Sequence, residues 1–182
     1  YLPQTASLSF GFRVVEVVEL GRLPHPMEAG SSSSMNIVYQ AMEYTGILHL
    51  AERNYTTLSG GEKQRVQLAR VFAQIWEAPS SGKRVLLLDE PVAALDLMHQ
   101  HTVLSTAAEF ARKGTAVILV LHDLNMAAMY SDKALLLKGG EVVDYGVSAD
   151  VLSVDNIRNT FRVEASLVQD PNWGRQIIST RL

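Results

Sequence analysis

Two runs of apolar residues, 85–88 and 116–121, stand out in the chain. Each is followed by polar residues of types that can bind ligands or take part in catalysis. Continuous apolar runs are typical of strands that are buried on both faces of a parallel sheet. The stretch between them, residues 97–113, has a helical composition and ends before Gly114. The pattern therefore predicts a strand–helix–strand crossover, and with it an α/β fold.

The first part of the chain, from about residue 10 to residue 57, has helical spacing of its apolar residues. Valines occupy one face of a short helix that is expected to end before Pro24. The Gly-Ser stretch at residues 30–34 predicts a surface connection, and its last serine, Ser34, is expected to cap the next helix. Gly46 is expected to end that helix.

The end of the chain has a weaker pattern. Residues 134–137 and 141–144 are separated by Gly139 and Gly140, which predicts a hairpin near a sheet edge. Residues 150–161 are expected to be helical, and the tail from Arg162 onward has no clear pattern. No apolar run approaches the roughly 18 residues that would span a bilayer, and no secretory signal is recognisable.

Composition narrows the possible functions. Hydrophobic residues make up 47% of the 182 residues, which is enough for a sizeable core. The net charge is −3 and there is no basic block, so nucleic acid is not expected as a partner. Cysteine is absent, which excludes disulfides, Cys-based metal sites and thiol catalysis.

The string Leu58-Ser59-Gly60-Gly61-Glu62 predicts a helix start with unusual exposure of the backbone. Ser59 and Glu62 have the spacing of a capping box. Two glycines weaken a first helical turn unless something must approach the backbone closely. Free N–H groups at a helix N-terminus attract anions, and phosphate is the anion that we expect here.

The apolar run at residues 85–88 is followed by Asp89 and Glu90, two carboxylates at the carboxyl edge of the predicted sheet, where open α/β sheets bind ligands. Asp89 is suited to hold Mg²⁺, and Glu90 is suited to polarise a nucleophilic water. His122 ends the second strand, so it is expected near Glu90. His99 and His101 are two positions apart on a helix and do not share a face, so we expect them to be surface residues.

Taken together and in this order, these motifs resemble those of the ATP-binding subunit of ABC transporters. The resemblance identifies residues 58–62, extended by Gln64 and Arg65, as the ABC signature, residues 86–90 as Walker B, residues 94–96 as the D-loop, His122 as the switch histidine and Gln4, in the first residues of the chain, as the Q-loop glutamine. It implies a P-loop NTPase-type parallel sheet with an inserted helical subdomain.

The resemblance also implies ligands and roles. ATP and Mg²⁺ are the expected cofactors, with Gln4 and Asp89 around the metal, Glu90 as base or water-positioner and His122 contacting the γ-phosphate. A second copy, arranged head to tail, is expected to present Leu58, Ser59, Gly60, Gly61 and Glu62 to the bound ATP, and Asp96 is expected to belong to the same nucleotide site.

The finer likeness is to importers of haem, ferric siderophores and vitamin B12, and closest to haem-import ATPases. It rests on residues 12–25, 64–70, 74–76, 95–100 and 120–125. It implies permease subunits as partners, a periplasmic substrate-binding protein as an indirect partner, and a peripheral location at the cytoplasmic face of the bacterial inner membrane. The permease is expected to dock near residues 10–26, where Arg22 is expected to be exposed.

The implied organisation is a Q-loop segment at residues 1–9, a helical subdomain at 10–57, the signature helix and α/β core at 58–162, and a tail at 163–182. Two features depart from the family pattern. Val92 and Ala93 stand where Thr and Ser are common, and no Gly-x-x-x-x-Gly-Lys-[Ser/Thr] phosphate cradle is present, because Gly82-Lys83 is followed by Arg84.

We therefore expect an N-terminally truncated ATPase that does not hydrolyse ATP as this chain alone. Two alternatives stay open at this point. One is an ABC-type ATPase that does not act in transport. The other is an incomplete piece that serves only as an interaction surface.

Overall fold

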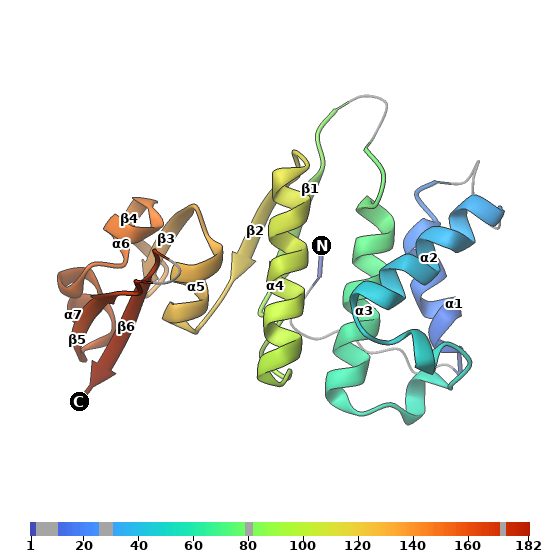
Figure 1. Ribbon diagram of the computed structural model, residues 1–182, viewed down its shortest axis with the longest axis horizontal. Coiled ribbons are helices and arrows are strands. Elements are labelled where there is room, and N and C mark those ends of the chain that lie inside the picture. Colours follow the sequence, from blue (N-terminus) through green and yellow to red (C-terminus); the bar gives the residue numbers. More distant parts are fainter. Residues whose placement is uncertain (3–10, 26–30, 79–81, 172–173) are drawn as a thin grey trace. The chain divides into compact units, whose positions relative to one another are not determined.

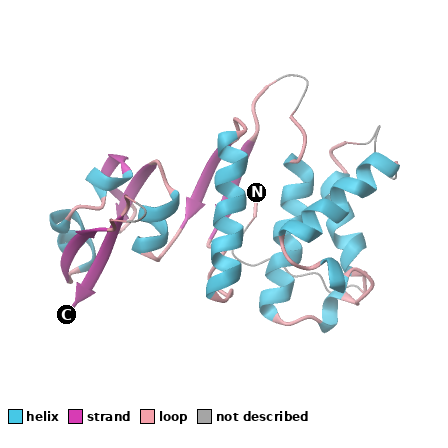
Figure 2. Cartoon of the chain, viewed as in Figure 1, coloured by secondary structure: helices cyan, strands magenta, loops and turns pink. Residues whose placement is uncertain are grey.

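The computed structural model describes residues 1–2, 11–25, 31–78, 82–171 and 174–182 (Figure 1). The chain forms two compact units, Tyr1–Val120 and Leu121–Leu182. Most of the helical residues belong to the first unit, and two strand pairs belong to the second (Figure 2). The boundaries expected after residues 9, 57 and 162 come from sequence motifs. The two units come from how the chain packs, so they do not test those boundaries, which stay predictions.

The first unit begins with three helices that pack against each other: α1 (Val14–Glu19), which continues as the 3₁₀ turn η1 (Leu20–Arg22), α2 (Ser32–Tyr44) and α3 (Gly60–Ile75). Two further 3₁₀ turns, η2 (Leu48–Leu50) and η3 (Tyr55–Thr57), connect α2 to α3. The contact is apolar and buried, as the helical spacing predicted; its members include Val14, Val17, Val18, Ile37, Val38, Ala41, Met42, Val66, Ala69 and Phe72.

The start of α2 differs from the prediction. Ser31, not Ser34, is the N-cap, and its hydroxyl accepts the Ser34 backbone N–H at 3.1 Å. A capping hydroxyl reaches the amide of N2 or N3, so here the helix begins after the first serine of the run rather than the last. Ser34 is instead buried inside the helix. The other end agrees with the prediction, since Gly46 has a φ of 66° just after the C-cap Thr45.

The predicted crossover is present. Strand β1 (Val85–Asp89) pairs in parallel with β2 (Ala116–Val120), with Asp89 opposite Val120, and α4 (Leu97–Arg112) joins them and packs on β2 (Figure 1). Leu2 lies beside β1, where its N–H donates to Leu87 O at 2.9 Å and its carbonyl accepts from Asp89 N at 3.0 Å. The first residues of the chain therefore reach the carboxyl end of β1.

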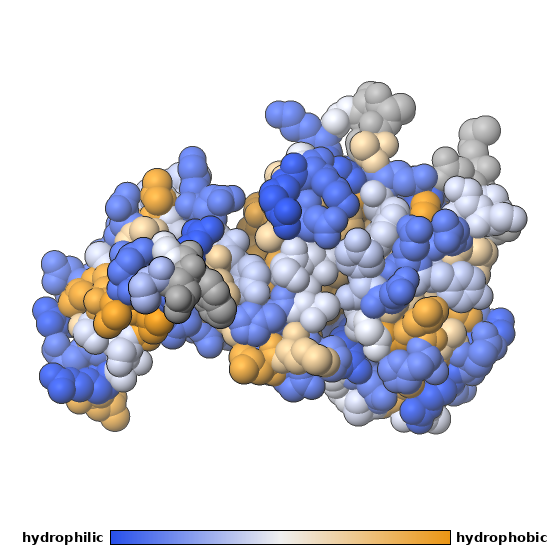
Figure 3. All heavy atoms as spheres, viewed as in Figure 1, coloured by the Kyte–Doolittle hydropathy of each residue, from blue (hydrophilic) through white to orange (hydrophobic). Residues whose placement is uncertain are grey.

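The prediction that both faces of these strands are buried is wrong for the residues described. Leu86 and Leu88 are fully buried, but Val85 and Ile118 are 57% and 55% exposed. Successive side chains of a strand point to opposite faces, and the described residues cover one of them. Exposed apolar side chains contribute to the surface of both units (Figure 3).

The second unit contains α5 (Leu124–Tyr130), the antiparallel pair β3 (Lys133–Lys138) and β4 (Glu141–Val147), α6 (Ser148–Val151), α7 (Val154–Phe161), and the antiparallel pair β5 (Glu164–Gln169) and β6 (Gln176–Arg181). The Gly139-Gly140 hairpin is confirmed. The helix predicted at 150–161 is two helices, because Ser153 caps α7. The tail forms a hairpin that the sequence did not reveal, and Ile178 from it joins the buried core of Ala128, Leu152 and Ile157.

Within the part of the chain that the structure describes, no helix combines the length and the apolar character that crossing a membrane requires.

Candidate functional site

The N-terminus of α3 has the predicted capping box. The Ser59 hydroxyl accepts the Glu62 backbone N–H at 3.3 Å, and Glu62 Oε2 accepts the Ser59 N–H at 2.7 Å. The Ser59 hydroxyl also donates to Glu62 Oε2 at 2.7 Å. These bonds to Ser59, the side-chain bond first, hold the pKa of the Glu62 carboxyl below its ordinary value. The helix start is thus fixed by its own side chains.

The two glycines of this helix start differ in their surroundings. A Cβ placed on Gly60 would meet no heavy atom within 4 Å, whereas one placed on Gly61 would lie 3.1 Å from the carbonyl oxygen of Ala94. Gly61 therefore permits close approach of the chain's own segment at residues 94–96. Gly60 leaves the helix end open to the outside, which is the geometry that an external anion requires.

The carboxylates at the end of β1 are placed as the sequence predicted. Asp89 is the last residue of the strand, and Glu90 follows it with a φ of 48°. This left-handed conformation is uncommon outside glycine and costs on the order of 1–3 kcal/mol. The Gln64 side-chain amide donates to the Glu90 carbonyl oxygen at 3.1 Å, so α3 contacts the turn that carries Glu90.

Asp96 lies at the N-cap of α4. Its Oδ1 accepts the backbone N–H of His99 at 2.9 Å and lies 2.7 Å from His99 Nδ1. The backbone bond first, and then the ring contact, lower the pKa of the Asp96 carboxyl. His99 is therefore half-buried and paired, and the expectation of a plain surface residue was wrong for it. The sequence signal for this pairing is the spacing of three between Asp96, a residue type typical of N-caps, and His99.

The segment between β1 and α4 is also held from its other end. The Gln100 side-chain amide donates to Leu95 O at 3.1 Å and to Val92 O at 3.3 Å. One of these acceptors belongs to Val92, which with Ala93 stands where the resemblance implies hydroxyl residues. The fold thus fixes the segment at residues 90–96 through α3 and α4, using the amides of Gln64 and Gln100, neither of which was singled out for this from the sequence.

The structure brings together two of the predicted groups, the start of α3 and the segment at residues 89–96. Gln4 lies outside the described residues. His122 lies in the second unit, so its proximity to Glu90 stays a prediction. Among the described residues, no group of three or more His, Asp or Glu side chains converges on a point where a metal could bind.

Asp89 nevertheless suits Mg²⁺, which keeps several waters and commonly takes one or two carboxylates together with substrate phosphates. A hard oxygen donor at the end of a strand fits that mode of binding. A protein cage of many ligands is not required for it.

Arg22 contradicts the expectation of an exposed docking residue. Its side chain is 1% exposed, and it donates to Ala73 O at 2.8 Å, Ser34 Oγ at 3.2 Å and Glu77 Oε2 at 2.8 Å. A long cationic side chain inside a helix bundle persists only when its donors are satisfied. The residue next to it, Leu23, is 67% exposed, so this turn presents an accessible apolar side chain.

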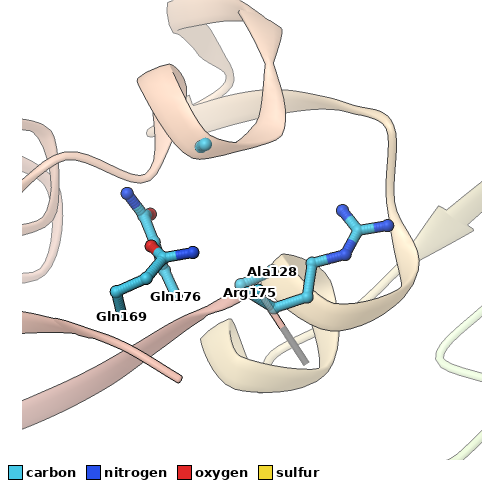
Figure 4. Close-up of a pocket in the computed structure, with 6 residues that line it drawn as sticks. Ala128, Gln169, Arg175 and Gln176 are labelled. Carbon is cyan, nitrogen blue, oxygen red and sulfur yellow. The ribbon is translucent and has the colours of Figure 1, made fainter. Parts of the chain in front are cut away.

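A surface cavity of about 120 Å³ lies in the second unit, where the amide of Gln169 and that of Gln176 point toward each other (Figure 4). Its lining is Ala128, Ala149, Gln169, Gly174, Arg175 and Gln176. None of these residues belongs to the predicted motifs, so the candidate site does not include this cavity.

A capped, open-ended helix that contacts the end of a parallel strand carrying Asp-Glu is the arrangement that the motifs predict for a nucleotide-binding domain of the P-loop NTPase class, ABC type. Comparison with known proteins agrees. Residues 1–93 match the ABC transporter family. The hemin import ATP-binding protein HmuV of Gloeobacter violaceus is 51% identical over 97% of this chain, and that of Pseudomonas aeruginosa is 46% identical over 99%.

A solved structure described as a metal-chelate type ABC transporter in an inward-facing conformation superposes with a TM-score of 0.80 at 28% identity, covering all of this chain and 72% of that one. The chain belongs to the ATP-binding family of ABC transporters. It spans 64% of the length of the Gloeobacter relative and 69% of the Pseudomonas one.

Proposed function

We propose that this chain is part of an ATPase subunit that powers the import of haem, or of a related iron chelate or cobalamin, through a membrane permease. The observation that supports this most is the 51% identity to a hemin import ATP-binding protein over nearly the whole chain. The likeness to a metal-chelate type ABC transporter points to the same class of cargo.

The proposed site takes ATP with Mg²⁺. Asp89, together with Gln4, would hold the metal, which screens the charge of the phosphates when bound. Glu90 would accept a proton from the attacking water or orient that water, and His122 would contact the γ-phosphate. The open start of α3, from Leu58 to Glu62, would bind the phosphates of an ATP held by a second copy, with Asp96 near the same interface.

The proposed partners are a second copy in a head-to-tail dimer, transmembrane permease subunits and, indirectly, a periplasmic substrate-binding protein. The proposed location is the cytoplasmic face of the bacterial inner membrane. The exposed apolar side chain of Leu23, beside the buried Arg22, is the docking contact that we propose for the permease. No nucleic acid partner is proposed, because the net charge is −3.

Glu90→Gln tests the enzymatic part of this proposal in the complete protein. The amide keeps the shape of the side chain but not its basicity, so turnover should fall by on the order of 10²–10⁴-fold while ATP binding persists. The variant should accumulate an ATP-bound dimer in size-exclusion chromatography. Adding Ser59→Arg, which places a bulky cation at the open helix start, should prevent that dimer. Wild-type turnover in Glu90→Gln would refute the assignment.

The cargo is tested by uptake of haem into cells that depend on the transporter. Glu90→Gln should abolish uptake, whereas Leu23→Glu should lower uptake and leave basal ATPase activity unchanged. ATP hydrolysis without any haem, siderophore or cobalamin uptake would instead favour an ABC ATPase that does not act in transport.

A further inference from the structure

Glu90 has a backbone conformation that its own sequence does not favour. Its φ of 48° is in the left-handed region, and the next residue is Pro91. A residue before proline is restricted toward extended conformations, and a residue with a Cβ rarely adopts positive φ. Contacts from outside the strand must therefore hold Glu90 in place.

The carbonyl oxygen of Glu90 accepts hydrogen bonds of unequal length from Ala93 and Gln64. The Ala93 N–H, which closes the turn within the segment, is 3.4 Å away, and the Gln64 Nε2 is 3.1 Å away. The shorter bond comes from a different element, α3, and from a side chain that is part-buried. It fixes the plane of the Glu90–Pro91 peptide, and that plane sets the direction in which the Glu90 side chain leaves the backbone.

The same region of α3 makes a second close contact with this segment. The backbone of Gly61 lies so near Ala94 that an added Cβ would be 3.1 Å from the Ala94 carbonyl oxygen. Gln64 is three residues further along the helix, and residues at that spacing share one face. The segment at residues 90–94 is thus held against one face of α3 at both of its ends.

We propose that Gln64 is a positioning residue for Glu90, whose amide holds the left-handed backbone that aims the Glu90 carboxylate at the attacking water. The proposal rests on the proposed ATPase function, because it assigns Glu90 the role of base or water-positioner. Gln64 itself touches neither nucleotide nor water in this role. It acts through the direction of the Glu90 side chain.

The test replaces Gln64 in the complete protein by Met, which keeps the length of the side chain and removes the donor, and by Glu, which keeps the shape and replaces the donor with an acceptor. Both variants should lose about 10- to 100-fold in kcat, while KM for ATP changes less than about twofold, because binding does not depend on the direction of Glu90. Two variants guard against a folding defect in either one.

Gln67→Met is the matched control. Gln67 lies on the same helix and is buried. Its side-chain amide donates to the Tyr55 hydroxyl at 2.9 Å, rather than to the segment that carries Glu90. Gln67→Met, like Gln64→Met, removes one hydrogen bond that a glutamine amide donates. Gln67→Met should therefore lower the unfolding midpoint and leave kcat near wild type. A fall in kcat of equal size in Gln67→Met and Gln64→Met would overturn the proposal in favour of a general weakening of α3.

A double-mutant cycle separates this proposal from the proposed function. If Gln64 acts through Glu90, Gln64→Met adds no further loss of turnover to Glu90→Gln. Additive losses, or a wild-type kcat in both Gln64 variants, would refute the positioning role while leaving the ATPase assignment intact. A wild-type turnover in Glu90→Gln would instead refute the assignment on which both depend.

Discussion

Two arginines near the start of the chain allow a direct test of what stabilises the helical part of the first unit. Arg13 is exposed and has ion pairs with Glu16 and Glu52 at 3.0 Å and 2.7 Å. Arg22 is buried and pairs with Glu77 at 2.8 Å. Both arginines form ion pairs, so the presence of an ion pair does not rank them, whereas burial predicts that Arg22 contributes more to stability. We expect burial to decide.

The expected magnitudes follow from the groups left behind. Arg22→Met removes the hydrogen bonds that Arg22 donates to Ala73 O and to the buried Ser34 hydroxyl. Ala73 lies in the last turn of α3, where carbonyl oxygens have no helical N–H partner. An unsatisfied buried group costs about 1–3 kcal/mol, and Met refills part of the volume, so the loss should be about 2–4 kcal/mol. Arg13→Met breaks exposed pairs and should cost less than about 1 kcal/mol.

Urea unfolding followed by Trp76 fluorescence measures both variants. Trp76 packs edge-on against Tyr44 and Phe110, with ring centroids 5.2 Å and 5.9 Å apart, so its emission reports on the first unit. Trp173→Phe in every variant removes the second tryptophan. With a slope of about 2 kcal/mol/M, the middle of the usual range in urea, Arg22→Met should lower the midpoint by about 1–2 M. A larger shift for Arg13→Met than for Arg22→Met would refute the reasoning.

Two further predictions concern α3. Gly21→Ala should destabilise the first unit by about 1–3 kcal/mol, because its Cβ would lie 2.1 Å from the Arg70 carbonyl oxygen, whereas Gly60→Ala, which meets open space, should be near neutral in the same urea titration. Ser59→Ala should cost about 1 kcal/mol through loss of the cap. Because the pKa of Glu62 lies below its ordinary 4.5, the stabilisation that the Glu62 carboxylate contributes is present above pH 4.5 and is lost as the pH falls through the lowered pKa. Ser59→Ala should therefore make the free energy of unfolding depend less on pH in this acid range. An unchanged pH dependence in Ser59→Ala would contradict this prediction.

Much of the fold could be predicted from the sequence where local chemistry is decisive. The β1–α4–β2 crossover follows from two apolar runs around a helical stretch, and the start of α3 follows from the spacing of Ser59 and Glu62. Glycines at 46 and 114 end α2 and α4 with φ values of 66° and 86°. In each case the pattern that predicts the element is local, so a short window of sequence contains it, although β1 and β2 pair residues that lie far apart in the chain.

The errors at Ser34 and His99 are local, since each decisive partner is three residues away, but the other errors occur where the decisive partner is distant in sequence. Arg22 is buried because Ala73 and Glu77, some fifty residues away, accept its hydrogen bonds, and no local pattern marks them. The hairpin of β5 and β6 depends on a core shared with α5 and α7, so its own alternation is weak. The left-handed backbone of Glu90 is likewise held by Gln64, on another element.

The two ends of α3 suggest why this helix matters beyond its signature residues. Its last carbonyls, from Ala73 to Trp76, are contacted by three side chains outside it: Arg22 to Ala73 O, His25 to Gln74 O at 2.9 Å, and Arg84 to Ile75 O and Trp76 O at 3.1 Å and 3.3 Å. Arginine side chains at a helix C-terminus complement the helix dipole as well as the free carbonyls. The turn that carries Leu23, which we propose as the permease contact, is thereby bonded to one end of a helix whose other end holds the Glu90 segment.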